Sequence, residues 1–319
     1  MQAVILAAGR GTRLQPITND RTKAMCPVVG KPMVERVMDT LVANGVREFV
    51  LVISPDDPEI QDYFKKRSTI KASVDFVEQA QQLGMGHALL QAAPYINDDF
   101  ILSSCDNLIA EKAIFRMLTM WVGYPPPNGI LALLRVGPDE LTRMGVVELE
   151  PEHGRILRIV EKPSLEEAPS NIGSVPIYMF TPKLLEYLKN VQPSPRGEYE
   201  LQDAIQPLIE KDGDVFGLML PDRIDLTLPN DLLRLNLQYL KNGHDQQDIR
   251  TEKIGRGTQF TAPVLVEAGV SISSNCQIGP NVFIESGAAI EKGVQLKNCV
   301  VLRGAVVPKE SSHQNQVIW

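Results

Sequence analysis

The chain has 319 residues, of which 44% are hydrophobic and 22% are charged, an ordinary composition for a folded globular protein. This length is sufficient for one large domain and a smaller one. The formal net charge of −7 argues against a general nucleic-acid-binding protein, which would normally carry a basic face.

The cysteines are scattered, with no CxxC pair and no matching histidine cluster; they are Cys26, Cys105, Cys276 and Cys299. This spacing argues against a zinc site and a disulfide framework, and it indicates reduced thiols in a cytoplasmic protein. No apolar run approaches the length of a membrane span. The opening residues lack a basic leader and run directly into a glycine-rich turn, so we interpret them as a first strand.

This first strand is followed by a glycine-rich, basic stretch, residues 6–23, with the sequence LAAGRGTRLQPITNDRTK. Glycine has no Cβ, so Gly9 and Gly11 permit a tight turn and the close approach of a ligand. Free N–H groups and cationic side chains at the end of a strand suit a polyphosphate. The alternative is a tight turn flanked by solvated basic residues, because the spacing fits neither the Walker pattern nor a dinucleotide fingerprint. The cations of the stretch are Arg10, Arg13, Arg21 and Lys23, against one acid, Asp20.

The turn belongs to a longer pattern: GxGTRL from Gly9, then KxxxP from Lys23, then GKPM from Gly30. This pattern resembles the signature of the nucleoside-diphosphate-sugar pyrophosphorylases, also called sugar-1-phosphate nucleotidylyltransferases. The resemblance implies that Arg13 and Lys23 are catalytic residues that contact the phosphates of a nucleoside triphosphate. Thr22 is a mild departure, since the family often has Pro or Ser before the lysine. The resemblance also implies nucleotide binding by Leu6, Ala8, Gly9, Gly11 and Thr12.

The following segments predict a doubly wound, Rossmann-like mixed α/β sheet. Apolar residues recur at helical spacing over 33–43, and a β-branched run at 49–53 suits a buried strand, which together give a βαβ unit with a right-handed crossover. Ligands of such sheets lie beyond the carboxyl ends of the strands. Further elements are expected at 59–66 (helix), 72–77 (strand), 87–93 (helix), 100–103 (strand) and 130–136 (strand), with a loop over 121–128.

A polar, glycine-punctuated segment over 78–86 resembles the family's base-reading loop. An amide side chain can donate to a pyrimidine O4 and accept from its N3–H at once, so we expect Gln79 and Gly84 to bind the nucleotide. The alternative is a solvated polar loop. His87 is expected to pack against or cap the following helix.

Two aspartates are the expected metal ligands. Asp106 closes a strand at the place where α/β enzymes hold magnesium, and a hard cation bound with a nucleotide commonly takes one or two carboxylates. The resemblance implies Mg²⁺ as cofactor on Asp106 and on Asp225, which precedes a helix expected at 230–240. The alternative for Asp106 is a strand-end aspartate that caps a turn.

A hairpin is predicted from strands at 144–149 and 156–163, and it resembles the sugar-phosphate side of the family. There Gly145 would allow close approach of the sugar, Glu161 would accept sugar hydroxyls and Lys162 would meet the phosphate. The alternative for the last two is an exposed ion pair at a strand end. Beyond them, Ser174-Val175-Pro176 replaces the family's Asn-Ala/Thr-Gly, which leaves the sugar's identity open and disfavours an N-acetyl sugar.

After helices at 182–189 and near 197–205, where the acids are expected to organise local structure, residues 241–252 are polar and predict a linker. A six-residue repeat of aliphatic residues then predicts a parallel β-helix of about three coils. The repeat contains no histidine, and His313 is assigned to the tail, so we do not expect the acetyl transfer of relatives with long β-helices. The repeating positions are Ile254, Phe260, Val266, Ile272, Ile278, Ile284, Ile290, Leu296 and Leu302.

The sequence therefore predicts a catalytic domain over 1–242, a linker over 243–252 and a short left-handed β-helix over 253–319. The expected activity is transfer of a pyrimidine nucleotide from UTP or dTTP to a sugar 1-phosphate, with glucose 1-phosphate favoured. Alternatives are formation of UDP-N-acetylglucosamine and a non-catalytic regulatory paralogue that binds a nucleotide sugar. The β-helix is expected to form homo-oligomer contacts, and neither nucleic acid nor membrane is expected as a partner.

Overall fold

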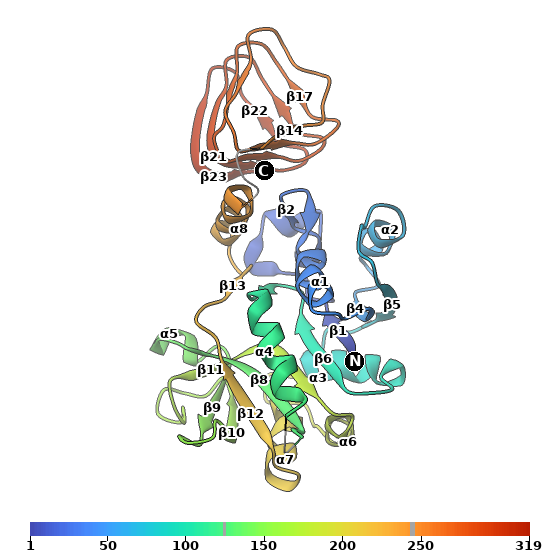
Figure 1. Cartoon of the computed structure of the whole chain (residues 1–319). Helices are drawn as coiled ribbons and strands as arrows, with labels where there is room; N and C mark the ends of the chain where they lie inside the picture. The colour runs from blue at the N-terminus through green and yellow to red at the C-terminus, as the bar shows by residue number, and fades with distance from the viewer. Residues whose placement is uncertain (124–125, 243–245) are drawn as a thin grey trace. The chain divides into compact units, whose positions relative to one another are not determined.

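The computed structural model describes residues 1–123, 126–242 and 246–319. Within these residues the chain divides into two compact units, which Figure 1 shows coloured along the chain. The first unit comprises Met1–Gly9 and Val37–Arg223, and the second comprises Arg10–Arg36 and Ile224–Trp319. The domain boundaries expected at 242 and 253 stay a prediction. Residues 124–125 of the predicted loop and 243–245 of the predicted linker lie outside the described residues.

The first unit is built on a mixed sheet in the order β10-β9-β11-β6-β1-β4-β5, with β8 beside β11 and β12 beside β8. The strands of this sheet are β1 (Gln2–Leu6), β4 (Glu48–Ile53), β5 (Ser73–Glu78), β6 (Phe100–Ser104), β8 (Gly129–Arg135), β9 (Gly145–Leu149), β10 (Ile156–Glu161), β11 (Ile172–Phe180) and β12 (Val215–Met219). The short strand β7 (Asn107–Leu108) belongs to the unit but not to this sheet. The helices of the unit are α2 (Pro58–Lys66), α3 (Met85–Ala92), α4 (Glu111–Trp121), α5 (Pro138–Leu141), α6 (Lys183–Leu188) and α7 (Gln202–Lys211), and α1 (Met33–Ala43) begins in the second unit and ends in the first.

The centre of this sheet is parallel and buried. β1 pairs in parallel with β4 and β6, and the continuous apolar runs of these strands bury almost every side chain. α3 packs on β1 and β4, and α4 packs on β8. The predicted Rossmann-like sheet is confirmed, and the parallel strands β1, β4 and β6 end at one edge, as the sequence predicted.

β11 carries the departure from the family pattern. Its pairing with β8 shifts between Val175, opposite Ala132, and Tyr178, opposite Leu131. Pro176 lies inside this irregularity, which is where a strand tolerates a residue without an N–H donor. The tyrosine hydroxyl of Tyr178 donates to Ser174 Oγ at 3.1 Å, so this stretch is ordered by its own side chains.

The second unit joins the basic stretch to a long helix and to the repeat region. Its elements are 3₁₀ helices at Thr12–Leu14, Ile17–Asn19 and Lys23–Met25, the strands β2 (Pro27–Val28), β3 (Lys31–Pro32) and β13 (Ile224–Asp225), helix α8 (Pro229–Asn242), and the strands β14 (Gln247–Ile249), β15 (Gln259–Phe260), β16 (Val264–Val266), β17 (Ser271–Ile272), β18 (Gln277–Ile278), β19 (Val282–Ile284), β20 (Ala289–Ile290), β21 (Gln295–Val301), β22 (Val306–Val307) and β23 (Ser312–Ile318).

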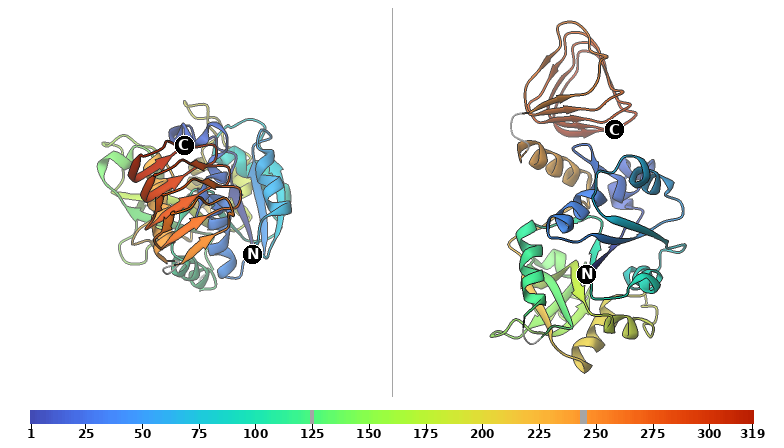
Figure 2. Two further views of the ribbon diagram at one scale, coloured as in Figure 1. Left: turned by 90° about the horizontal axis from the view of Figure 1, so that it is seen from above. Right: turned by 45° about the vertical axis from the view of Figure 1, so that its right-hand side comes forward.

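The repeat region forms the predicted parallel β-helix, whose stacked coils are visible in Figure 2. Its interior is a column of aliphatic side chains with Cys276 and Cys299 among them. α8 packs against β19, β21 and β23, and also against β2. Asn236 of α8 is fully buried; its Oδ1 accepts from Val29 N at 2.8 Å and its Nδ2 donates to Pro27 O at 3.0 Å. The helix thus fixes the chain just beyond the basic stretch.

Three details of this region correct the sequence analysis. Val266 pairs with Ile284, eighteen residues on, but Ile284 pairs with Val301, seventeen on, so Val301 takes the strand position predicted for Leu302. The reason is a corner one residue shorter: Lys297-Asn298 stands where Gly279-Pro280-Asn281 turned the preceding coil.

The other two corrections concern the ends of the β-helix. Within the predicted linker, Gln247–Ile249 forms β14 and pairs with β16. The predicted tail forms β23 and pairs with β21, so His313 lies opposite Leu296 in the last coil. Polar composition concealed both strands because a strand at the end of a β-helix can keep one face in solvent.

Candidate active site

The carboxyl end of β1 lies in the first unit and carries three of the predicted nucleotide contacts. The carbonyl of Leu6 accepts from Cys105 N at 3.1 Å, which fixes the end of β1 beside the end of β6. The carbonyl of Ala8 accepts from Gln82 Nε2 at 2.6 Å. Gly9 is exposed, and among the described residues no atom lies within 4 Å of the place of a Cβ there. This edge is therefore ordered by neighbouring loops and open at Gly9.

The loop after β5 is held by the side-chain amide of Gln79 and by a backbone hydrogen bond from Tyr199. Gln79 is 4% exposed, and its Nε2 lies 3.2 Å from Gly84 O and 3.0 Å from His87 Nδ1. Gly84 abuts the backbone of Tyr199, whose N donates to Leu83 O at 2.7 Å. His87 lies inside α3 and does not cap it, and its ring packs near the Tyr199 ring. Gln79 thus organises the loop, and its contact with a base stays a prediction.

Asp106 lies two residues after the end of β6, with Asn107 as a partner that the sequence analysis missed. The amide nitrogen of Asn107 donates to Asp106 Oδ1 at 2.7 Å and to Ser104 Oγ at 2.9 Å. Asn107 is 6% exposed, so this amide fixes the orientation of the carboxylate. The sequence showed only that Asn107 is next to Asp106, and being next to each other in the chain does not determine whether two side chains are in contact.

The hairpin of β9 and β10 brings the three predicted sugar-phosphate residues together. Gly145 pairs with Glu161 across the antiparallel ladder, and Lys162 N donates to Met144 O at 3.1 Å. A Cβ on Gly145 would stand 2.8 Å from Ser174 Oγ and 3.0 Å from Gln202 Nε2. Gly145 therefore admits these two buried polar side chains. The sequence analysis did not predict a role for Gln202, because the segment near 197–205 was expected only to organise local structure.

Glu161 is a half-buried acid with one oxygen in use. Its Oε1 lies 3.3 Å from Lys162 Nζ, while its Oε2 is buried and has no hydrogen-bond partner among the described residues. Burial raises the pKa of Glu161 from 4.5 to about 6; Lys162 opposes the shift and the nearby Glu200 adds to it. Glu200 itself accepts from Ser194 Oγ and Arg196, which are local contacts as expected for this segment, whereas Glu198 Oε2 lies 3.6 Å from Lys162 Nζ. A buried carboxylate oxygen without a partner calls for an explanation, and a functional role is one of those that apply.

The predicted phosphate contacts of the second unit lie in the basic stretch. Gly11 has φ of +69°, and the place of a Cβ on it is 2.9 Å from Lys23 Cβ, so a side chain there would be strained and would strike the lysine. The Gly11 carbonyl accepts from Thr18 Oγ1 at 2.9 Å. Thr12 and Arg13 are exposed, and Lys23 is half-buried. Gly11 and Lys23 are thus adjacent, and Arg13 extends to solvent on the same turn.

Arg21 does not join these cations. Its side chain is 2% exposed and its Nη1 lies 2.7 Å from Glu285 Oε1 in the β-helix. Burial alone would lower the pKa of Arg21, and the Glu285 carboxylate more than offsets this, so the pKa is raised. The expectation that all four cations edge a phosphate site was therefore wrong for Arg21. Beside it, burial raises the pKa of Cys26 to about 12, which makes this thiol inert.

Asp225 lies in β13, in the second unit. Its Oδ2 accepts from Thr227 Oγ1 at 3.0 Å, and Arg234 Nη2 lies 3.8 Å from its Oδ1. Asp231 Oδ2 accepts from the N–H groups of Thr227 and Leu228 and so caps the start of α8. The carboxylate of Asp225 is thus held at the entrance to a capped helix.

Within residues 1–123, 126–242 and 246–319, no group of three or more His, Cys, Asp or Glu side chains could hold a metal ion. A hard cation that shares phosphate oxygens needs only one or two carboxylates, so this finding leaves the two aspartates as candidates. The four cysteines, all among the described residues, form no disulfide. None of the helices in the described part of the chain combines the length and apolar character that crossing a bilayer requires.

Comparison with known proteins gives a consistent result. The chain matches the family model described as "Nucleotidyl transferase" over residues 2–242, and the one described as "GMPPB C-terminal domain" over residues 260–318. It is 36% identical over 273 residues to the bifunctional protein GlmU of Methanococcus maripaludis strain C7, which covers 85% of this chain and 62% of GlmU. This chain thus spans less than two thirds of that relative.

Two further similarities concern glucose. The chain is 35% identical over 233 residues to the UTP–glucose-1-phosphate uridylyltransferase AglF of Haloferax volcanii, covering 72% of this chain and 93% of AglF. In structure it is similar to a UDP-glucose pyrophosphorylase complexed with UDP-glucose, with a TM-score of 0.69 and 26% identity. That alignment covers 76% of this chain and 98% of the pyrophosphorylase.

Proposed function

The chain belongs to the nucleotidyl transferase family, and we propose that it joins a sugar 1-phosphate to a nucleoside triphosphate with release of pyrophosphate. The proposed substrates are glucose 1-phosphate and a pyrimidine triphosphate, UTP or dTTP. The name of AglF, with UTP and glucose 1-phosphate, and the UDP-glucose in the similar pyrophosphorylase support this choice.

The observation that carries the proposal is the arrangement at the end of the β9–β10 hairpin. Glu161 presents a buried oxygen without a partner among the described residues, and Lys162 stands beside it. A sugar hydroxyl is a donor that such an oxygen can accept, and an ammonium can meet the attached phosphate. A sugar phosphate therefore fits the two groups together.

In the proposed reaction, an oxygen of the sugar phosphate attacks the α-phosphorus of the triphosphate. A new P–O bond forms, the bond from the α-phosphorus to the bridging oxygen breaks, and pyrophosphate leaves with the electron pair. Such transfers depend on positioning and on stabilisation of charge more than on covalent help. We assign Lys23 to the α-phosphate and Arg13 to the departing pyrophosphate.

The residues present suit Mg²⁺ in the chemistry of their donors. Asp106 and Asp225 would hold the ion with carboxylate oxygens, which are the ligands that this cation prefers. The ion would supply neutralisation of phosphate charge. Asn107, through its bond to Asp106 Oδ1, would keep that carboxylate in one orientation.

The similarity to GlmU favours one alternative, formation of UDP-N-acetylglucosamine from N-acetylglucosamine 1-phosphate. Pro176 in the β11 irregularity argues against it, since the family's Asn and Gly are both replaced there. Comparing kcat/KM for the two sugar phosphates separates the alternatives.

The decisive experiment is pyrophosphate release measured with Mg²⁺ over a panel of triphosphates and sugar 1-phosphates. We expect turnover with UTP or dTTP and glucose 1-phosphate, and Asp106→Ala should lower kcat by roughly 10²–10³. Asp98→Ala, at an exposed aspartate, is the control and should keep normal turnover. If no pair of substrates in the panel gave pyrophosphate release, the result would instead support a regulatory protein that binds a nucleotide sugar.

We also propose that the β-helix mediates homo-oligomer contacts, giving trimers, dimers of trimers or tetramers. A β-helix ends in open coils that need cover. Light scattering on the intact protein tests this, and a monomer would refute it.

A further inference from the structure

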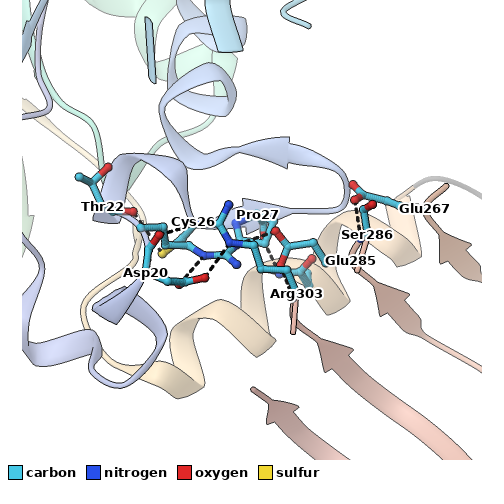
Figure 3. Close-up of polar contacts among 10 residues, drawn as sticks. Asp20, Thr22, Cys26, Pro27, Glu267, Glu285, Ser286 and Arg303 are labelled. Carbon is cyan, nitrogen blue, oxygen red and sulfur yellow. Dashed lines mark hydrogen bonds and ion pairs between the residues drawn. The ribbon is translucent and has the colours of Figure 1, made fainter. Parts of the chain in front are cut away.

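A ring of four charged residues joins the basic stretch to the β-helix within the second unit (Figure 3). Arg21 Nη1 lies 2.7 Å from Glu285 Oε1, and Arg303 Nε lies 2.7 Å from Asp20 Oδ2. Arg303 Nη2 also donates to the carbonyl of Asp20 at 2.6 Å. Arg21 Nε lies 3.3 Å from Asp20 Oδ1, which closes the ring on the side of the stretch. We name these residues, Asp20, Arg21, Glu285 and Arg303, the loop anchor.

The β-helix side of the loop anchor is fixed by its own coils. Glu285 directly follows β19, and its Oε2 accepts from Arg303 N at 2.8 Å on the next coil. Glu291 makes the same bond between coils, since its Oε2 accepts from Lys309 N at 2.7 Å. Glu285 therefore performs a repeated structural task with one oxygen and holds Arg21 with the other.

The side of the loop anchor in the basic stretch depends on the ion pair between Arg21 and Glu285. The side chain of Arg21 is 2% exposed, and that of Glu285 is 12% exposed. Without Glu285, the buried guanidinium keeps only Asp20, whose Oδ1 lies 3.3 Å from Arg21 Nε and whose side chain is 55% exposed. Losing the closer and more buried partner of a buried charge costs more than losing a surface ion pair, so we expect the stretch to shift until Arg21 reaches water.

Such a movement would reach the predicted phosphate contacts. Lys23 is two residues from Arg21, and Thr22 O accepts from Met25 N at 3.1 Å within the same 3₁₀ helix. Lys23 in turn backs on Gly11, whose carbonyl is bound by Thr18 Oγ1. The stretch is thus one connected body, held at Arg21 by the β-helix and beyond it by Asn236 on Pro27 and Val29.

From this geometry we propose that Glu285 is a positioning residue: it acts from the β-helix through Arg21 to place Lys23 and Arg13 for the phosphates of a nucleoside triphosphate. The β-helix then contributes to the reaction through the loop anchor, besides any part in assembly. The kinetic part of this inference rests on the proposed function, and its structural part does not.

The test compares Glu285→Ala with Glu291→Ala, because both variants remove a bond between coils and only the first removes the partner of Arg21. We expect Glu285→Ala to raise KM for the triphosphate about 10-fold, since small displacements of positioning groups are costly. KM for the sugar phosphate should change less than about 2-fold, as its predicted contacts lie in the first unit. Glu291→Ala should match the wild type in both constants.

A second readout needs no turnover. Hydrogen exchange of peptides covering residues 10–25 should be about 10-fold faster in Glu285→Ala than in Glu291→Ala, without bound nucleotide. Arg303→Ala keeps the Arg21–Glu285 pair and removes the Asp20 contacts, so it should show a smaller change in the same direction if Glu285→Ala folds poorly.

Equal exchange and equal KM values in the two glutamate variants would overturn the inference. If the wild type is silent across the substrate panel, the proposed function fails, and the exchange comparison still decides whether Glu285 holds the stretch.

Discussion

Glu161 and Glu285 are both half-buried glutamates beside a basic residue, yet they differ in how their oxygens are used. Glu161, in the first unit, leaves one buried oxygen without a partner among the described residues. Glu285, in the second, gives one oxygen to Arg21 and the other to a backbone N–H of the next coil. The unsatisfied carboxylate costs stability and offers an acceptor, as binding sites commonly do, whereas the satisfied one stabilises the fold.

The largest expected effect is on the reaction. Glu161→Ala should lower kcat/KM for glucose 1-phosphate by roughly 10²–10³, because a sugar hydroxyl loses a charged acceptor in a dry site. KM for the triphosphate should stay within about 2-fold of the wild-type value. Steady-state kinetics with each substrate varied in turn measures both constants. Glu148→Ala, at an exposed position of the neighbouring strand β9, is the control; equal losses in both variants would contradict the assignment.

For the free energy of unfolding the order of the two glutamates should be reversed, with the larger effect at Glu285. Glu285→Ala should lower the free energy of unfolding by about 3 kcal/mol, because it leaves the buried Arg21 with only the longer contact to the exposed Asp20. Glu161→Gln should not lower it, since the neutral amide removes the penalty of a buried, half-satisfied charge. Urea unfolding followed by circular dichroism compares the two variants. A greater loss in Glu161→Gln would reverse the comparison.

The raised pKa of Glu161 adds a pH dependence. Its pKa is about 6 in the folded protein because of burial, against 4.5 for an ordinary glutamate. The folded state therefore holds the proton more tightly, so its contribution to stability is complete below pH 4.5 and is lost as the pH rises through 6. The loss amounts to about 2 kcal/mol.

Unfolding free energies of the wild type and Glu161→Gln between about pH 3.5 and 7 measure this term, because this interval extends about one unit beyond both pKa values. The wild type should fall relative to the variant as the pH rises. Parallel curves would show that Glu161 titrates normally and that its site is wetter than the structure indicates.

The smallest effect is expected in the exposed half of the loop anchor. Arg303→Ala removes contacts to Asp20, whose side chain is 55% exposed, so unfolding should change by at most about 1 kcal/mol. Added salt should reduce this difference, since exposed charges are screened. Unfolding in 0.05 M and about 0.5 M NaCl measures it, with Lys309→Ala as control at an exposed position. A change as large as that of Glu285→Ala would mean that the ring acts as one unit.

Much of the fold could be predicted because its signals are local. The helical spacing over 33–43 matches α1 residue for residue, and the six-residue repeat identified the β-helix. The same locality explains the errors. One residue fewer in the corner at Lys297-Asn298 shifts the last coil by one position, and an aliphatic pattern with Val301 and Leu302 adjacent fits either register.

The candidate site divides in the same way. Sequence alone determined which residue types gather in the glycine turn and at the end of the β9–β10 hairpin, because motif spacing and strand pairing follow from short-range patterns. Only the tertiary structure decided that the Gln79 side chain bonds within its own loop. It also decided that Arg21 pairs with Glu285, 264 residues away, and not with a phosphate beside the other cations. The partner of a charged side chain depends on which distant segments the fold brings near, and no local periodicity carries that information.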